Sequence, residues 1–126
     1  MRYVLDTSFL IDYMRGDPPT VARFARMFED GDALFVNEVA VCELASGVAP
    51  DAEGAMAALL EPLEFIQPGP EAAITAGQWR QAARRRGAML SVPDALIAAA
   101  ADTMDATVLT RNPRDFALTP ARVEAY

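Results

Sequence analysis

Four carboxylates in this chain occupy positions where a carboxylate should be costly. Asp6 ends an apolar run, Glu43 lies in a mostly apolar segment, Asp94 opens an alanine-rich run, and Asp115 follows a strand-like segment. A buried charge is unfavourable unless it is paired or binds a metal. Because the chain contains no lysine and no histidine, a divalent cation is the natural partner for these acids. The pattern predicts metal-dependent hydrolysis.

The residue types that are missing exclude several kinds of site. Without lysine there is no P-loop lysine and no Schiff base, and without histidine there is no Ser-His-Asp triad and no histidine metal ligand. The single cysteine, Cys42, rules out a cysteine-rich zinc site and an internal disulfide. The carboxylate and carbonyl oxygens that remain suit Mg²⁺ and Mn²⁺.

Length and composition predict one globular domain over residues 1–126. Of the 126 residues, 52% are hydrophobic and 23% are charged, which is typical of a globular chain. No apolar run approaches the roughly 20 residues of a membrane span. The start of the chain leads directly into a strand, so we expect no signal peptide and a reducing, cytoplasmic setting.

The net charge of −7 argues against general electrostatic binding of nucleic acid. It leaves room for local basic strips. Residues 80–86 hold four arginines, and Arg111 and Arg114 flank Asn112. Either group could hold phosphates, although the arginines of residues 80–86 could also form a solvated helix face.

Apolar runs and Pro/Gly breakers predict strands that alternate with helices. Strands are expected at residues 2–5, 33–36, 63–66, 107–110 and 123–126, and helices at 8–14, 19–28, 37–47, 51–60, 69–86, 91–104 and, as a short turn, 113–116. This alternation indicates an α/β fold with a parallel sheet covered on both faces. Ligands bind such sheets at the carboxyl ends of the strands, where Asp6 and Asp115 fall.

Two of the acids have an alternative explanation as helix caps. Asp6 could cap a helix that starts near Ser8, and Ser91 with Asp94 resembles a capping box. In the functional interpretation, Asp6 and Asp94 bind a metal, and the hydroxyls of Thr7 and Ser8 contact a phosphate or a water of the metal.

The other two acids are also open to two interpretations. Glu43 points past the small residues Ser46 and Gly47 from a helix that we expect to be packed on nearly all sides, or it is a surface glutamate. Asn112 and Asp115 belong to the site or to a simple Asn-Pro turn. The remaining aspartates, Asp12, Asp17, Asp30, Asp32, Asp102 and Asp105, look like ordinary surface or loop acids.

Taken together, four segments resemble the PIN-domain ribonucleases, and most of all the VapC-type toxins of bacterial toxin–antitoxin pairs. They cover residues 4–12, 43–47, 93–99 and 109–116, in the family's order. The resemblance implies a PIN domain, with a central, mainly parallel sheet of about four to five strands, and a Mg²⁺- or Mn²⁺-dependent endoribonuclease. It also implies a cognate antitoxin, a homodimer and a possible higher toxin–antitoxin assembly.

The resemblance also assigns roles to the acids. Asp6, Glu43 and Asp94 match the family's three principal acids, with Asp6 and Asp94 as direct metal ligands and Glu43 acting directly or through water. Many relatives carry an aspartate where this chain has Asn112, and Asp115 lies one turn further. This departure leaves open which residue fills the fourth position, and whether one metal or two bind.

The expected mechanism is hydrolysis of an RNA phosphodiester by a water whose pKa is lowered by the bound cation. Thr7, Ser8, Arg111 and Asn112 are the expected substrate contacts, with the arginines of residues 84–86 as an alternative phosphate clamp.

Two rival enzyme classes fit poorly. A haloacid-dehalogenase-type phosphatase needs an aspartate where Ser8 stands and a later lysine, and a receiver domain also needs that lysine. The remaining alternative is a catalytically silent PIN-like module that binds RNA or protein. In either case, an acidic pocket invites an arginine or lysine from the antitoxin, and the helix face around Phe24 and Phe28 could receive the antitoxin's helix.

Overall fold

The computed structural model describes residues 1–126 and is built around one five-stranded sheet. Its strands are β1 (Arg2–Leu5), β2 (Ala33–Asn37), β3 (Glu64–Ile66), β4 (Thr107–Thr110) and β5 (Arg122–Ala125). They lie in the order β3-β2-β1-β4-β5, and every neighbouring pair is parallel. The predicted parallel α/β sheet is confirmed, with β1 at its centre.

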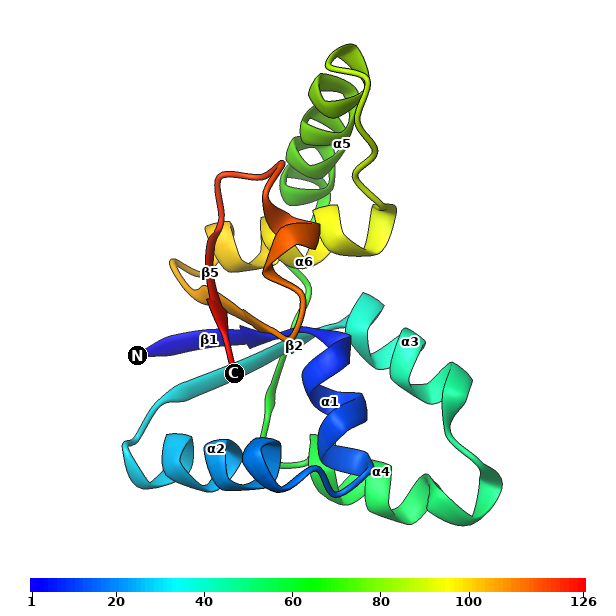
Figure 1. Ribbon diagram of the computed structural model, residues 1–126, viewed down its shortest axis with the longest axis vertical. Helices are drawn as coiled ribbons and strands as arrows, with labels where there is room; N and C mark the ends of the chain where they lie inside the picture. Colours follow the sequence, from blue (N-terminus) through cyan, green and yellow to red (C-terminus); the bar gives the residue numbers. More distant parts are fainter.

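Helices cover both faces of the sheet. They are α1 (Thr7–Met14), α2 (Pro18–Glu29), α3 (Glu38–Gly47), α4 (Glu53–Leu60), α5 (Pro70–Arg85) and α6 (Val92–Thr103), with 3₁₀ turns η1 (Pro50–Ala52) and η2 (Pro113–Phe116). Figure 1 shows α5 and α6 on one side of the sheet and α1 and α2 on the other. Because the strands are covered on both faces, all residues of β4, and all residues of β1 except Arg2, are buried without alternation.

The alanine-rich segment behaves as expected of a buried helix. Residues 97–101 of α6 are all buried, and so is Ala95. Small side chains allow α6 to lie close to its neighbours, and its first turn reaches the carboxyl end of the sheet. That packing fixes the position of Asp94, the one acid in this turn.

Four details differ from the prediction. The helix expected at 51–60 is divided into η1 and α4, and α5 begins one residue late because Gly69 adopts a φ of 91°, which favours glycine. Helix α3 buries only two residues, so the expectation that it is packed on nearly all sides was wrong. Phe24 belongs to the core, whereas Phe28 is 42% exposed.

Candidate functional site

Asp6 is the buried acid at the centre of the site. It lies between β1 and α1 with extended backbone angles, at the N-cap position, yet its side chain makes no capping hydrogen bond. Its Oδ2 instead accepts hydrogen bonds from the hydroxyls of Ser8 (2.9 Å) and Thr110 (2.7 Å). Its Oδ1 accepts none from the protein. Capping therefore does not explain this carboxylate, which presents one free oxygen.

Two hydroxyls join the end of β4 to the start of α1. The backbone N–H of Arg111 donates to Ser8 Oγ (3.1 Å), and that of Asn112 donates to Thr110 Oγ1 (3.0 Å). Thr110 was not among the predicted site residues. Its position follows from the parallel pairing of Leu5 with Leu109, which places the next residue of each strand side by side.

Glu43 reaches the site from an exposed part of α3. Its Oε1 accepts a hydrogen bond from Thr7 Oγ1 (2.7 Å), which links the first turn of α1 to the middle of α3. Glu43 is therefore exposed, as the surface interpretation expected. Its carboxylate nevertheless lies against Thr7, the residue that follows Asp6.

Asp94 lies within electrostatic range of the other three acids. Its backbone N–H donates to Ser91 Oγ (3.2 Å), so the expected cap is formed. Burial raises the pKa of its carboxyl to about 6; the Ser91 hydroxyl opposes the rise, and the charges of Asp6, Asp115 and Glu43 add to it. Four elements that are distant in sequence therefore direct carboxylates toward one region.

The chemistry of the donor set fits a hard divalent cation. All four acids offer oxygen, and the pKa of Asp94 is raised mainly by burial, with a smaller contribution from the charges of the other three acids. No three acidic side chains lie close enough together to hold one ion among them. Since Mg²⁺ is commonly held by one or two carboxylates with waters completing its shell, direct ligation by all of Asp6, Glu43 and Asp94 is not required.

A second buried acid was missed by the sequence analysis. Asp12, expected to be an ordinary surface acid, is 7% exposed. Its Oδ1 accepts a hydrogen bond from Arg111 Nη1 (2.5 Å), and its Oδ2 accepts one from the hydroxyl of Tyr126 (2.7 Å). The only available signal was the spacing of Ser8 and Asp12, four residues apart on one face of α1.

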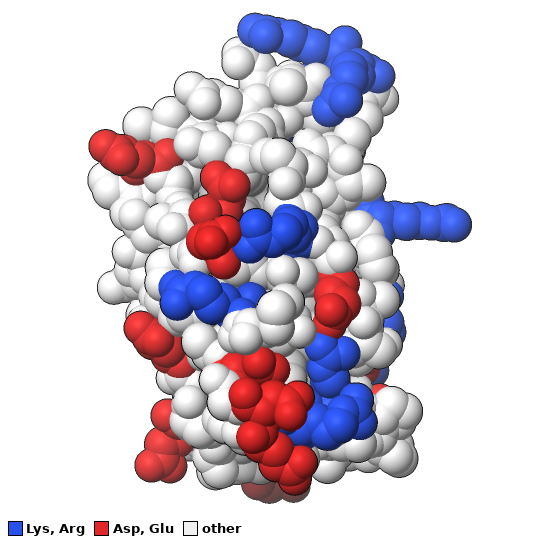
Figure 2. All heavy atoms as spheres, turned by 90° about the vertical axis from the view of Figure 1, so that its left-hand side faces the viewer, with Lys and Arg blue, Asp and Glu red and all other residues white.

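The arginines of residues 84–86 do not reach the acids. They lie at the end of α5, which projects from the body well away from the junction of β1 and α1 (Figure 1). Figure 2 shows basic side chains gathered at this tip, whereas acidic and basic side chains are interspersed over the rest of the same face. The tip is a solvated helix end, so these arginines are not a phosphate clamp beside the acids. Arg80 instead donates to the carbonyl of Leu90 (2.9 Å) and fixes the loop before α6.

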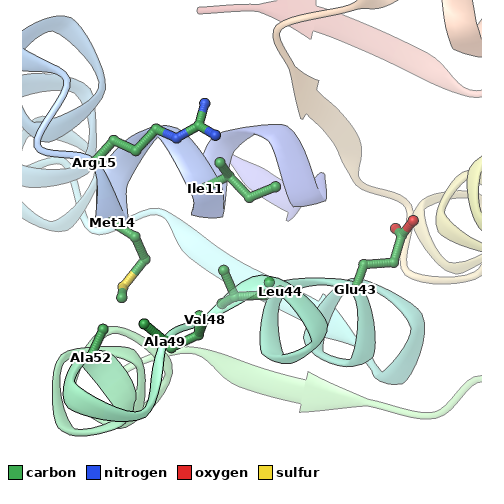
Figure 3. A pocket seen from close by; sticks show the side chains of 9 residues that line it. Ile11, Met14, Arg15, Glu43, Leu44, Val48, Ala49 and Ala52 are labelled. Carbon is green, nitrogen blue, oxygen red and sulfur yellow. The ribbon is translucent and has the colours of Figure 1, made fainter.

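An apolar groove opens next to Glu43. It has a volume of about 250 Å³ and runs between α1, α3 and η1 (Figure 3). Ile11, Met14, Leu44 and Val48 supply most of its apolar wall, and Glu43 stands at one end with its carboxylate pointing out of the apolar part. Neither Phe24 nor Phe28 lines it.

The chain is similar to known proteins over nearly its whole length. The family model of the PIN domain matches residues 3–121. Ribonuclease VapC19 of Mycobacterium tuberculosis is 27% identical over 117 residues, which are 93% of this chain and 94% of that protein. Ribonuclease VapC1 of Haemophilus influenzae is 25% identical over 121 residues, 92% of this chain and 90% of that protein.

Solved structures share the fold. The crystal structure of DNA-bound VapBC from Salmonella typhimurium superimposes with a TM-score of 0.86 at 25% identity, covering 99% of this chain and 98% of that chain. No helix here has the length and apolar character needed to cross a membrane.

Proposed function

The chain belongs to the PIN-domain family, and on that premise we propose that it is the toxin of a toxin–antitoxin pair and a metal-dependent endoribonuclease. Similarity to two proteins named ribonuclease VapC, and to the VapBC complex, supports this proposal. The observation that carries it is the arrangement of Asp6, Glu43, Asp94 and Asp115: burial raises the pKa of Asp94, and the charges of the other three acids add to the rise.

Asp6 and Asp94 would hold Mg²⁺ or Mn²⁺ directly, with Glu43 and Asp115 acting through water. A metal in this position lowers the pKa of a water and offsets negative charge on the phosphate. The protein's own part is to orient the acids. Two hydroxyls hold one oxygen of Asp6 and leave the other free, while Thr7 fixes Glu43. Asp94 must be ionised to ligate, so activity should rise with pH through about 6.

Cleavage of RNA by matched variants tests the proposal. Total RNA is incubated with Mg²⁺ and the purified protein, or with its Asp6→Asn, Asp94→Asn or Asp102→Asn variant. We expect at least about a 100-fold loss for the first two, because a metal ligand is lost, and none for Asp102→Asn, which alters an exposed acid on the same helix. Undiminished cleavage by Asp94→Asn would overturn the assignment. If the unaltered protein binds RNA but never cleaves it, the silent binding module is correct.

We propose that the antitoxin occupies the groove beside Glu43. An extended or helical segment with apolar side chains would cover Ile11, Met14 and Val48, and an arginine or lysine at its end would reach the acids. Such a cation would offset the same uncompensated charge as the metal. Inhibition and metal binding should therefore compete, which can be measured by varying the Mg²⁺ concentration during inhibition.

The homodimer also belongs to the proposal. Ile74, Met89 and Val92, on the hairpin of α5 and α6, are 61%, 89% and 48% exposed, and a second copy could cover them. Sedimentation velocity of the protein and of a Met89→Asp variant tests this. A dimer that is unaffected by the substitution would place the interface elsewhere.

A further inference from the structure

We propose that Asp12 and Tyr126 are positioning residues that fix Arg111 as a phosphate-binding arm beside the acid cluster. This inference rests on the proposed ribonuclease function and adds residues that bind the RNA backbone. Asp12 is nearly buried, and each of its carboxylate oxygens is used: Oδ1 by Arg111 Nη1 and Oδ2 by the Tyr126 hydroxyl. A carboxylate held at both oxygens has little freedom to turn, so it can define where the guanidinium lies.

The tyrosine is itself held in place. Its ring meets Phe9 edge to face, with centroids 4.9 Å apart. Burial raises the pKa of the Tyr126 hydroxyl well above its ordinary value, and its hydrogen bond to Asp12 adds to the rise. The hydroxyl therefore remains a proton donor to Asp12 at any pH at which the protein would act. Asp12 of α1 thus contacts both Arg111, which follows β4, and Tyr126, which follows β5.

Arg111 connects this clamp to the site. Its backbone N–H donates to Ser8 Oγ, and the same hydroxyl donates to Asp6. Its side chain is 50% exposed, and Asp12 is its only hydrogen-bond partner, through Nη1. Of the five N–H donors of a guanidinium, most therefore remain free, in the planar geometry that recognises phosphate. Asp12 therefore holds the guanidinium of Arg111 through Nη1, and the remaining N–H groups are available to a phosphate.

The overall charge makes one oriented cation important. At a net charge of −7, the protein has no general attraction for a polyanion. Arg15 lines the apolar groove and Arg114 is exposed on η2, but neither makes an ion pair. Arg111 is the arginine that a buried acid holds next to Asp6.

A purely structural role is the competing explanation, in which Arg111 only neutralises Asp12. A double-mutant cycle separates positioning from simple neutralisation. If Tyr126 only positions Arg111, its substitution can affect RNA binding only while Arg111 is present. The cycle uses Arg111→Ala and Tyr126→Phe, each in the Asp94→Asn protein so that bound RNA is not cut. Tyr126→Phe removes the hydroxyl and keeps the ring on Phe9.

The matched control is Tyr3→Phe. It removes a hydroxyl that accepts a hydrogen bond from Arg23 (3.3 Å), away from the acids. The measurement is fluorescence anisotropy with a labelled 12-nucleotide oligouridylate over a range of salt concentrations. The contact proposed is to phosphate and does not depend on sequence, so a homopolymer suffices as the probe.

Arg111→Ala should weaken binding about 10-fold and lower the slope of log K against log salt by about 0.7, the value for one phosphate contact on a single strand. Tyr126→Phe should weaken binding about threefold when Arg111 is present and have no further effect when it is absent. Tyr3→Phe should leave binding unchanged.

Three results would overturn the inference: no effect of Arg111→Ala, no effect of Tyr126→Phe, or an effect of Tyr126→Phe that persists undiminished in Arg111→Ala. Failure of the ribonuclease proposal would give a different result. The protein with Asp94 intact would leave RNA uncut, while Arg111→Ala and Tyr126→Phe would still show coupling in RNA binding. Absence of any binding at low salt would overturn both.

Discussion

The hydroxyl of Thr110 donates a 2.7 Å hydrogen bond to the carboxylate of Asp6, across 104 residues of sequence. Both residues follow directly on paired positions of β1 and β4. The same carboxylate oxygen also accepts from Ser8. The central acid of the site is thus oriented by the two strands that form the middle of the sheet, so the stability of the fold and the geometry of the site are linked.

Thr110→Val should destabilise the protein by about 1–3 kcal/mol, because a buried charged acceptor loses one of its two donors. Valine has nearly the same shape as threonine, so packing is retained. Urea unfolding at pH 7.5 measures the change. Thr107→Val is the matched control, since Thr107 is buried in the same strand and its hydroxyl makes no hydrogen bond within the protein. Equal losses in the two variants would contradict the role given to Thr110.

The raised pKa of Asp94 predicts how stability depends on pH. The carboxyl has a pKa of about 6 in the folded protein, against about 3.9 when unfolded. Between these values the folded state binds more protons than the unfolded state, so stability falls as the pH rises from about 4 to about 6. The Asp94→Asn substitution removes this pH-dependent loss of stability. In the absence of metal, the free energy of unfolding of the variant should exceed that of the parent at pH 8 by on the order of 1 kcal/mol after solvent screening. At pH 3.5 the variant should be no more stable than the parent.

Chemical unfolding at both pH values measures this difference. Asp102→Asn, on the exposed side of α6, should behave as the parent at each pH. A stabilisation by Asp94→Asn that is the same at pH 3.5 and pH 8 would mean that charge is not its cause.

The fold was predictable because its signals are local. Continuous apolar runs mark the covered strands, and the Pro and Gly residues between them end each element close to where the structure ends it. Once the strands are parallel, the residues that follow them must share one edge, which brings Asp6 and Asp115 into the same region. The start of α3 is equally local, because the side chain of its N-cap residue Asn37 accepts a hydrogen bond from the N–H of Ala40.

The site was less predictable where it depends on tertiary contacts. The partners of Asp12 lie 99 and 114 residues further along the chain, so no pattern around Asp12 could show that it is buried. The packing of α3 around Glu43 was misjudged for the opposite reason. The small and apolar residues around it suggested a helix covered on every side, whereas only Ala40 and Leu44 are buried. Helical periodicity cannot identify the buried face when polar residues are scarce.

Magnesium should stabilise the folded protein in a way that depends on both pH and Asp94. A ligand that binds only the folded state adds about 2.7 kcal/mol at 100 times its Kd. At pH 7.5 Asp94 is ionised and available, whereas at pH 5 it is mostly protonated. Thermal unfolding should therefore show a larger shift with Mg²⁺ at pH 7.5, and the shift should vanish in Asp6→Asn and in Asp94→Asn. A full shift in a protein that carries both substitutions would place the cation elsewhere.

The groove can be filled without disturbing the fold. Gly47 lines it at the end of α3, and a Cβ added there would meet no atom within 4 Å. A Gly47→Leu side chain should therefore project into the space that we assign to the antitoxin. Binding of the antitoxin that we propose, measured by titration calorimetry, should weaken at least about 10-fold, the loss expected when buried apolar contacts at an interface are blocked. Gly77→Leu is the matched control, because Gly77 is exposed on α5 with equal room for a Cβ and lies outside the groove. Tight binding by Gly47→Leu, together with weakened binding by Gly77→Leu, would move the antitoxin from this groove to the surface of α5.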